Sequence, residues 1–175
     1  MRGEISKEAF SAEGYITDQR KLVNVAYGKY TSDYNGCGWI AAYNLFRLCG
    51  IAAEPDEVRA DLEKRLKFGG KFGTFPTELK RYLQKKLDVK MKIRSRKSVA
   101  KMCSGRGILL YWTGKSAHNA VFCRCEESED KFRVLNVSEK ADDERIEPAK
   151  FVREKIRFPL CIVFEVAEKV QNKRE

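Results

Sequence analysis

The sequence predicts an α+β fold, with helices in the first half of the chain and a mostly antiparallel sheet in the second. Up to about residue 87 the apolar residues recur at helical spacing, whereas from Val89 onward they alternate with polar residues as in strands. In addition, residues 39–49 are almost wholly apolar and follow a polar, glycine-flanked turn around Cys37. Together these patterns predict a buried central helix that begins at Cys37 and packs on the sheet.

The predicted helices carry start and stop signals of their own. The central helix should end at about Leu48, because Gly50 suits a left-handed C-cap. A second helix is expected from Pro55, since proline favours the first helical position, and its apolar residues continue to Leu66. Residues 74–77 hold start signals for a third helix, whose apolar face runs to about residue 87.

The remaining segments read as strands, turns and ends. Residues 1–20 are polar and mixed, and we expect a loosely attached N-terminal arm. The sequence predicts a single domain over residues 21–167 and a charged C-terminal tail over residues 168–175. Within the domain we expect strands at 21–27, 89–94, 107–113, 119–126, 132–137 and 160–166, a short helix or loop at 97–103, an acidic loop at 139–147 and a short helix at 148–156.

Length and composition indicate a soluble globular protein. A chain of 175 residues can bury roughly two thirds of its unfolded surface without disulfides or metals. The N-terminus lacks the apolar segment of a signal peptide, and the apolar runs are the length of strands. We therefore expect a cytoplasmic protein without a membrane span, whose six cysteines stay thiols.

The net charge of +10 is concentrated in one segment. Residues 79–106 hold eleven lysines and arginines against the single acid Asp88. A solvated face is the simplest interpretation, and an anionic partner such as nucleic acid, lipid or an acidic substrate is the alternative. Tyr82 is the only aromatic residue in this segment, which argues against a stacking platform for single strands.

Cys37 and His118 are the residues most suited to chemistry. A thiol in the first turn of a helix lies at the positive end of the helix dipole, which favours the thiolate. His118 is the only histidine in the chain and stands where polar residues give way to an apolar strand. A lone histidine is more often structural, but a helix-terminal thiol and a strand-borne imidazole are the two halves of a cysteine nucleophile and its base.

Asn136 is the candidate for orienting the imidazole. It follows the apolar residues 134 and 135 on the next predicted strand, where a buried amide needs a partner. Alternatively, Asn136 caps the end of that strand. Asn119 is a poorer candidate, because neighbouring residues of a regular strand point to opposite faces.

The segment 35–39, the strand that starts at His118 and Asn136 on the following strand resemble the papain-like cysteine peptidases. Their order and spacing are closest to the bacterial peptidases that process the double-glycine leaders of bacteriocins, and to stand-alone relatives of these. The resemblance spans about residues 27–164 and implies the papain-like cysteine proteinase fold. It also implies a nucleophile at Cys37, a base and later acid at His118, and an orienting residue at Asn136, where the leader peptidases usually have aspartate and papain has asparagine.

The oxyanion hole departs from the family pattern. The family usually supplies a glutamine six residues before the cysteine, and this chain has Thr31 there. The Cys37 backbone N–H can serve as one donor, with Asn35 or Thr31 as candidates for the second. A missing donor costs about 10² to 10³ in rate.

These observations lead to the hypothesis of a cysteine hydrolase that acts on a peptide or amide through an acyl-enzyme. Acyl transfer by the same residues, and a non-catalytic papain-like module that binds through residues 79–106, are the alternatives. No cofactor and no metal are expected, although Cys123 and Cys125 share one face of a strand. Cys103 lies between cations and is a second candidate for a reactive thiol.

Overall fold

The computed structural model describes residues 3–102, 105–125, 128–137 and 143–167. Cys103 and the predicted tail 168–175 lie outside these ranges. The elements in chain order are η1 (Lys7–Ala9), η2 (Gln19–Lys21), β1 (Ala26–Tyr27), β2 (Tyr30–Thr31), α1 (Ser32–Asn35), α2 (Cys37–Leu48), α3 (Pro55–Glu63), η3 (Phe68–Gly70), α4 (Pro76–Leu83), β3 (Val89–Ser95), α5 (Arg96–Val99), β4 (Arg106–Trp112), β5 (Ala117–Arg124), β6 (Phe132–Leu135), β7 (Asp143–Ile146), α6 (Pro148–Lys155) and β8 (Leu160–Val166).

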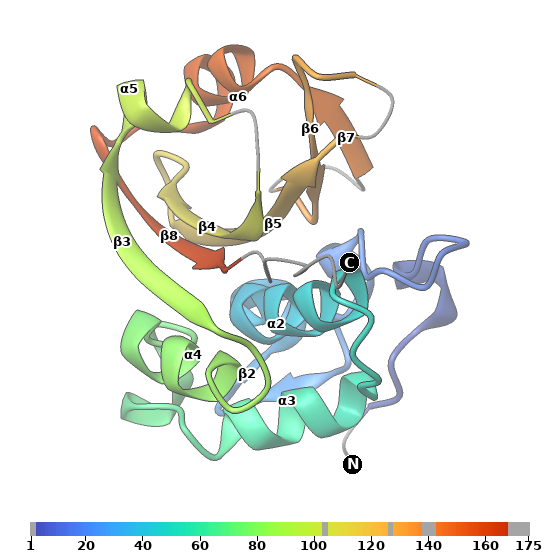
Figure 1. Cartoon of the computed structure of the whole chain (residues 1–175). Coiled ribbons are helices and arrows are strands. Elements are labelled where there is room, and N and C mark those ends of the chain that lie inside the picture. Colours follow the sequence, from blue (N-terminus) through green and yellow to red (C-terminus); the bar gives the residue numbers. More distant parts are fainter. Residues whose placement is uncertain (1–2, 103–104, 126–127, 138–142, 168–175) are drawn as a thin grey trace.

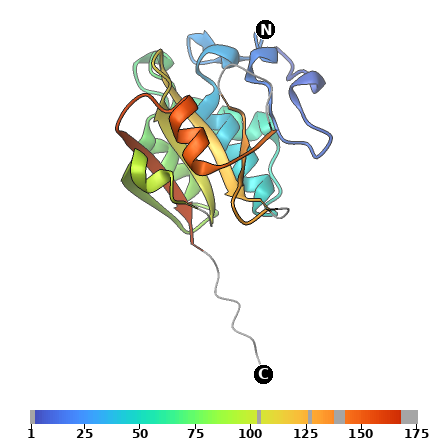
Figure 2. The same ribbon diagram turned by 90° about the horizontal axis from the view of Figure 1, so that it is seen from above.

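A six-stranded antiparallel sheet organises the second half of the chain. Its strand order is β3-β8-β4-β5-β6-β7, so the last strand in sequence lies inside the sheet. Helices α2, α3 and α4 lie on one side of this sheet, and α5 and α6 lie on the other (Figures 1 and 2). This arrangement confirms the predicted α+β fold.

Each face of the sheet contributes to a separate hydrophobic core. Ile108, Val121 and Phe164 point to the side of α2 and join the larger core there. Their neighbours Leu109 and Val163 point to the opposite side, where α6 supplies Phe151. The central strands are thus buried on both faces, which is why they read as nearly continuous apolar runs.

Helix α2 is the central element that the sequence predicts. It begins at Cys37 and ends at Leu48, and every residue from Gly38 to Phe46 is buried. Gly50 has a φ of 69°, the left-handed conformation expected just after the helix. Because α2 packs against β5, the first turn of the helix lies beside the sheet.

The N-terminal segment differs from the loose attachment expected for residues 1–20. Ala9 and Ile16 are fully buried. The Asn44 side chain of α2 accepts a hydrogen bond from the Ile16 N–H and donates one to the Ile16 carbonyl, and both distances are 2.8 Å. The segment is fixed because it satisfies a buried amide of the central helix, a contact across 28 residues that local patterns do not reveal.

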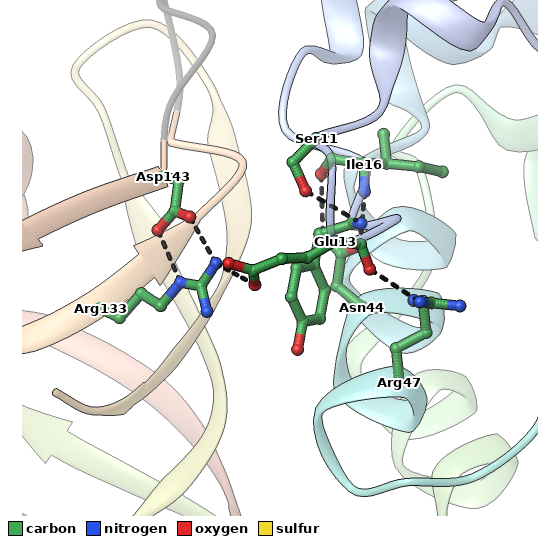
Figure 3. Close-up of polar contacts among 8 residues, drawn as sticks. Ser11, Glu13, Ile16, Asn44, Arg47, Arg133 and Asp143 are labelled. Carbon is green, nitrogen blue, oxygen red and sulfur yellow. Dashed lines mark hydrogen bonds and ion pairs between the residues drawn. The ribbon is translucent and has the colours of Figure 1, made fainter. Parts of the chain in front are cut away.

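Glu13 links this segment to both halves of the molecule (Figure 3). Its carbonyl accepts from Arg47 Nη2 of α2 at 2.7 Å, and its carboxylate accepts from Arg133 Nη2 of β6 at 2.6 Å. Arg133 also forms a two-point ion pair with Asp143 of β7. The division into arm, domain and tail stays a prediction.

Two predicted segments are wrong in type. Only Ala26–Tyr27 of the expected strand 21–27 is a strand, because Asp18 caps a 3-10 turn at Gln19–Lys21. Part of the acidic loop 139–147 is the edge strand β7, which pairs with β6. Charged edge strands are common, since charge discourages pairing with another molecule.

Among the residues that the structure describes, no helix has the length and apolar character needed to cross a membrane.

Candidate active site

Cys37 is the first residue of α2, and the turn before it is tightly built. Helix α1 (Ser32–Asn35) runs into Gly36, which has near-helical backbone angles and leads directly into α2. The Trp39 indole N–H donates a buried hydrogen bond of 3.1 Å to Ser32 Oγ. The thiol is therefore held on a rigid support and remains partly exposed.

His118 lies next to this thiol. It is the second residue of β5 and only 7% exposed. Its side chain interacts with the Cys37 thiol strongly enough to shift the pKa of both groups, and its ring packs edge-on against Tyr111, the residue opposite on β4. On its other side, Nε2 lies 2.6 Å from the backbone oxygen of Asn136, which leaves Nδ1 to serve the thiol.

The two side chains shift each other's titration. Burial alone would raise the pKa of Cys37, but hydrogen bonding and charge attraction from His118 outweigh it and lower the pKa. Burial opposes protonation of His118, yet the contact with Cys37 and the Asn136 oxygen raise its pKa. Both shifts favour a thiolate beside an imidazolium.

Three of the other described thiols show the opposite behaviour. Burial raises the pKa of Cys49, and it raises the pKa values of Cys123 and Cys161 to about 11. Cys37 thus differs from these three in the direction of its shift.

Asn136 meets His118 through its backbone and not through its amide. The residue directly follows β6 and has a φ of 57°, in the left-handed region that asparagine tolerates better than most residues. Its amide nitrogen donates to Gln19 Oε1 at 3.2 Å, and Gln19 Nε2 donates to the Asp33 carbonyl at 2.9 Å. Gln19 therefore connects Asn136 to helix α1, although Gln19 and Asn136 lie 117 residues apart in the sequence.

Asn119 is the residue near the thiol that sequence reasoning set aside. Its Nδ2 lies 3.5 Å from Cys37 Sγ, and its proximity helps to lower the pKa of the thiol. It does point to the opposite face from His118, as predicted, but Cys37 lies at the start of β5 where both neighbours reach it. A polar residue facing α2 in an otherwise apolar strand is the signal that could have identified it.

The two candidate oxyanion donors are placed differently from Asn119. Thr31 is the residue before α1, and its side chain makes no capping bond. Asn35 is 6% exposed, and its Nδ2 donates a hydrogen bond to the Gly70 carbonyl at a distance of 2.6 Å. The Asn35 amide thus fastens the turn to the loop at Gly70.

No group of three or more histidine, cysteine, aspartate or glutamate side chains in the described part of the chain is arranged to hold a metal ion.

The comparison with solved structures identifies a similar fold. The peptidase domain of Streptococcus ComA, a bifunctional ABC transporter involved in a quorum-sensing pathway, superposes with a TM-score of 0.52 and 16% sequence identity. The match covers 75% of this chain and 92% of that domain. The predicted resemblance to leader peptidases of the papain-like group is confirmed at the level of the fold.

No protein-family model matches the sequence, and no curated protein is similar to it. The chain has the fold of a cysteine peptidase.

Proposed function

We propose that this chain is a cysteine hydrolase that cleaves a peptide or amide bond through an acyl-enzyme. The contact between Cys37 and His118 carries the proposal, because it lowers the pKa of the thiol and raises that of the imidazole. The peptidase-domain fold supports a peptide as the substrate class. In this proposal Cys37 is the nucleophile, His118 the general base and later acid, and Asn136 the orienting residue through its carbonyl.

The proposed reaction has two halves. The Cys37 thiolate attacks the carbonyl carbon, and the imidazolium of His118 then gives its proton to the leaving amine, so that a thioester remains. Next, His118 removes a proton from water, the resulting hydroxide attacks the thioester, and the thiol is restored. If an amine replaces water in this second half, the same residues perform acyl transfer.

The negative oxygen of the tetrahedral intermediate needs donors in both halves. The Cys37 backbone N–H is available as one, since the first N–H groups of a helix have no partner within the helix. Asn119 Nδ2 is the second donor that we propose, on the basis of its 3.5 Å distance from Cys37 Sγ. Asn119 is a better substitute for the missing glutamine than Asn35, because the Asn35 amide already donates to the Gly70 carbonyl.

The test is the rate at which iodoacetamide alkylates each cysteine, followed by peptide mass spectrometry as a function of pH. Because the pKa of Cys37 is lowered, its rate should rise below the pH of about 8.5 that is usual for thiols. In His118→Ala the thiol loses the imidazole while its burial remains, so the rise should move to higher pH. Equal labelling of all six cysteines in the folded protein would refute the activated thiol.

Binding of an anionic partner through residues 79–106 is a second candidate function. Eight cationic residues in this segment are exposed, namely Arg81, Lys85, Lys86, Lys90, Lys92, Lys97, Lys101 and Arg106. Two of them, Lys92 and Arg81, form ion pairs with Glu165 and Glu78 respectively. Titration of labelled DNA or anionic vesicles at increasing salt tests this function: binding should weaken steeply with salt and persist in Cys37→Ala.

A further inference from the structure

Three phenylalanines form an exposed cluster on the glycine-rich loop between α3 and α4. The rings of Phe68, Phe72 and Phe75 lie 6.2 to 6.5 Å apart between centroids. Phe68 is 76% exposed and Phe72 is 65% exposed, although aromatic side chains are usually covered. Phe68 also has a φ of 51°, an unusual conformation for a bulky residue. Such exposure and strain in one loop indicate a surface that is covered when a ligand binds.

The loop is fastened to the turn that carries the nucleophile. The Gly70 carbonyl accepts from the Asn35 amide at 2.6 Å. Thr74 lies so close to Gly38 that a Cβ on this glycine would come within 2.5 Å of the threonine oxygen. Thr74 is itself fixed by a buried hydrogen bond of 2.6 Å to the Tyr27 hydroxyl. Phe75, the last residue of the cluster, thus directly follows Thr74, whose side chain packs on Gly38, the neighbour of Cys37.

The charges around the cluster have a single sign. Lys67 and Lys71 are exposed on the same loop, and the Lys29 side chain packs over Gly69. The sequence has no aspartate or glutamate between residues 64 and 77. The Glu63 carboxylate, just before this range, is engaged by Arg59 and by the Gly28 N–H. The Lys71 ammonium lies over the Phe72 ring, 5.6 Å from its centroid, so a ligand that covers the rings meets positive charge there.

From this arrangement we infer that Phe68, Phe72 and Phe75 form a subsite for an aromatic or branched aliphatic side chain of the substrate, beside an acidic residue of the same peptide. This inference rests on the proposed function, since it names the kind of peptide that the thiol acts on. The subsite gains from burying apolar surface of both partners, and the lysines add electrostatic attraction to the acidic residue. A peptide is favoured over a lipid surface because the loop is tied at Gly70 and Thr74 to the turn that holds the thiol.

The experiment uses short peptidyl vinyl sulfones that capture Cys37 covalently. One set contains a single phenylalanine moved through successive positions with glycine elsewhere, and a second set adds a neighbouring glutamate or lysine. We expect phenylalanine at one position to speed capture about tenfold over the all-glycine probe. Glutamate beside it should speed capture further, and lysine should slow it. No preference for phenylalanine at any position would overturn the subsite.

Variants then connect the preference to the loop. Phe68→Ala and Phe72→Ala should remove most of it, whereas Phe72→Leu should retain it. Ile93→Ala is the matched control, since Ile93 is 70% exposed on the edge strand β3, away from this loop in sequence. Ile93→Ala should react with iodoacetamide at the wild-type rate, and the capture rate of each loop variant is divided by its own iodoacetamide rate.

The outcomes separate this inference from the function on which it rests. If iodoacetamide shows no activated Cys37, the proposed hydrolase fails. If Cys37 is activated but the phenylalanine preference survives in Phe68→Ala and Phe72→Ala, only the subsite fails. Sedimentation with phosphatidylcholine–phosphatidylserine vesicles, or a dimer in size-exclusion chromatography, would also overturn the subsite if either is abolished by Phe72→Ala.

Discussion

His118 is held in place by a main-chain oxygen, and this determines what the residue at position 136 has to be. A backbone carbonyl does not depend on the side chain of its own residue, whereas the φ of 57° at Asn136 does favour asparagine or glycine. The amide of Asn136 contributes indirectly, through Gln19. In the proposed mechanism Asn136 is therefore a positioning residue whose conformation matters more than its functional group.

Substitutions at position 136 test this distinction. Asn136→Gly keeps both the acceptor and the left-handed conformation, so most of the fast alkylation of Cys37 should remain. Asn136→Val retains a carbonyl but strains a β-branched residue at positive φ, which costs about 1–3 kcal/mol. We expect slower alkylation and a lower midpoint of urea unfolding in that variant. If the glycine variant is as slow as the valine variant, the amide itself orients the imidazole.

Asn119 offers a second test at this scale, because its function and its stability contribution should separate. Asn119→Leu removes an amide donor from the thiolate, so the Cys37 pKa should rise. Stability should change little or increase, since the Asn119 Oδ1 is buried without a hydrogen-bond partner. Alkylation against pH and urea unfolding measure the two effects, and exposed Asn24→Leu serves as the control. An unchanged alkylation profile would contradict the assignment.

The sequence predicted these side chains unevenly for a physical reason. Cys37 and His118 stand at element boundaries, where a turn gives way to a helix or a strand, and such boundaries are visible locally. The contact of Asn119 with Cys37 spans 82 residues, and that of Asn136 with Gln19 spans 117. Contacts of that separation depend on how the helices dock on the sheet.

At the scale of elements, local chemistry fixed the helix starts. Pro55, Pro76 and Pro148 each occupy the first position of a helix, as proline's restricted φ favours. The elements that were missed depend on distant partners. Strand β7 forms because β6 pairs with it, and the N-terminal segment is ordered by Asn44 of α2.

The Arg133 cluster should contribute to stability in proportion to its burial. The Arg133 side chain is 15% exposed and binds both Glu13 and Asp143. Arg133→Met leaves two carboxylates without their partner, and we expect a loss of about 1–3 kcal/mol in urea unfolding. Arg124, which pairs with Glu129 and is 56% exposed, is the matched control. Arg124→Met should change stability by less than about 1 kcal/mol. If both variants lose the same free energy of unfolding, the Arg133 cluster stabilises the protein no more than the exposed Arg124–Glu129 pair does.

At the scale of the whole molecule, the papain-like fold followed from the order of helices, strands and three short motifs. The strand order of the sheet could not be predicted from the sequence, because alternation of apolar and polar residues indicates a strand but not the strands with which it pairs. A cytoplasmic location stays a prediction.

The position of β8 has a consequence for the timing of activity. This strand lies between β3 and β4, and its Phe164 belongs to the core under α2. A chain that ends at Pro159 can form the hairpins of β4 to β7 but lacks the strand that joins them to β3. We expect such a chain to label at Cys37 no faster than the urea-unfolded protein, and fast labelling would contradict this. If the proposed function holds, a chain still on the ribosome would carry the Cys37 thiol long before that thiol becomes reactive.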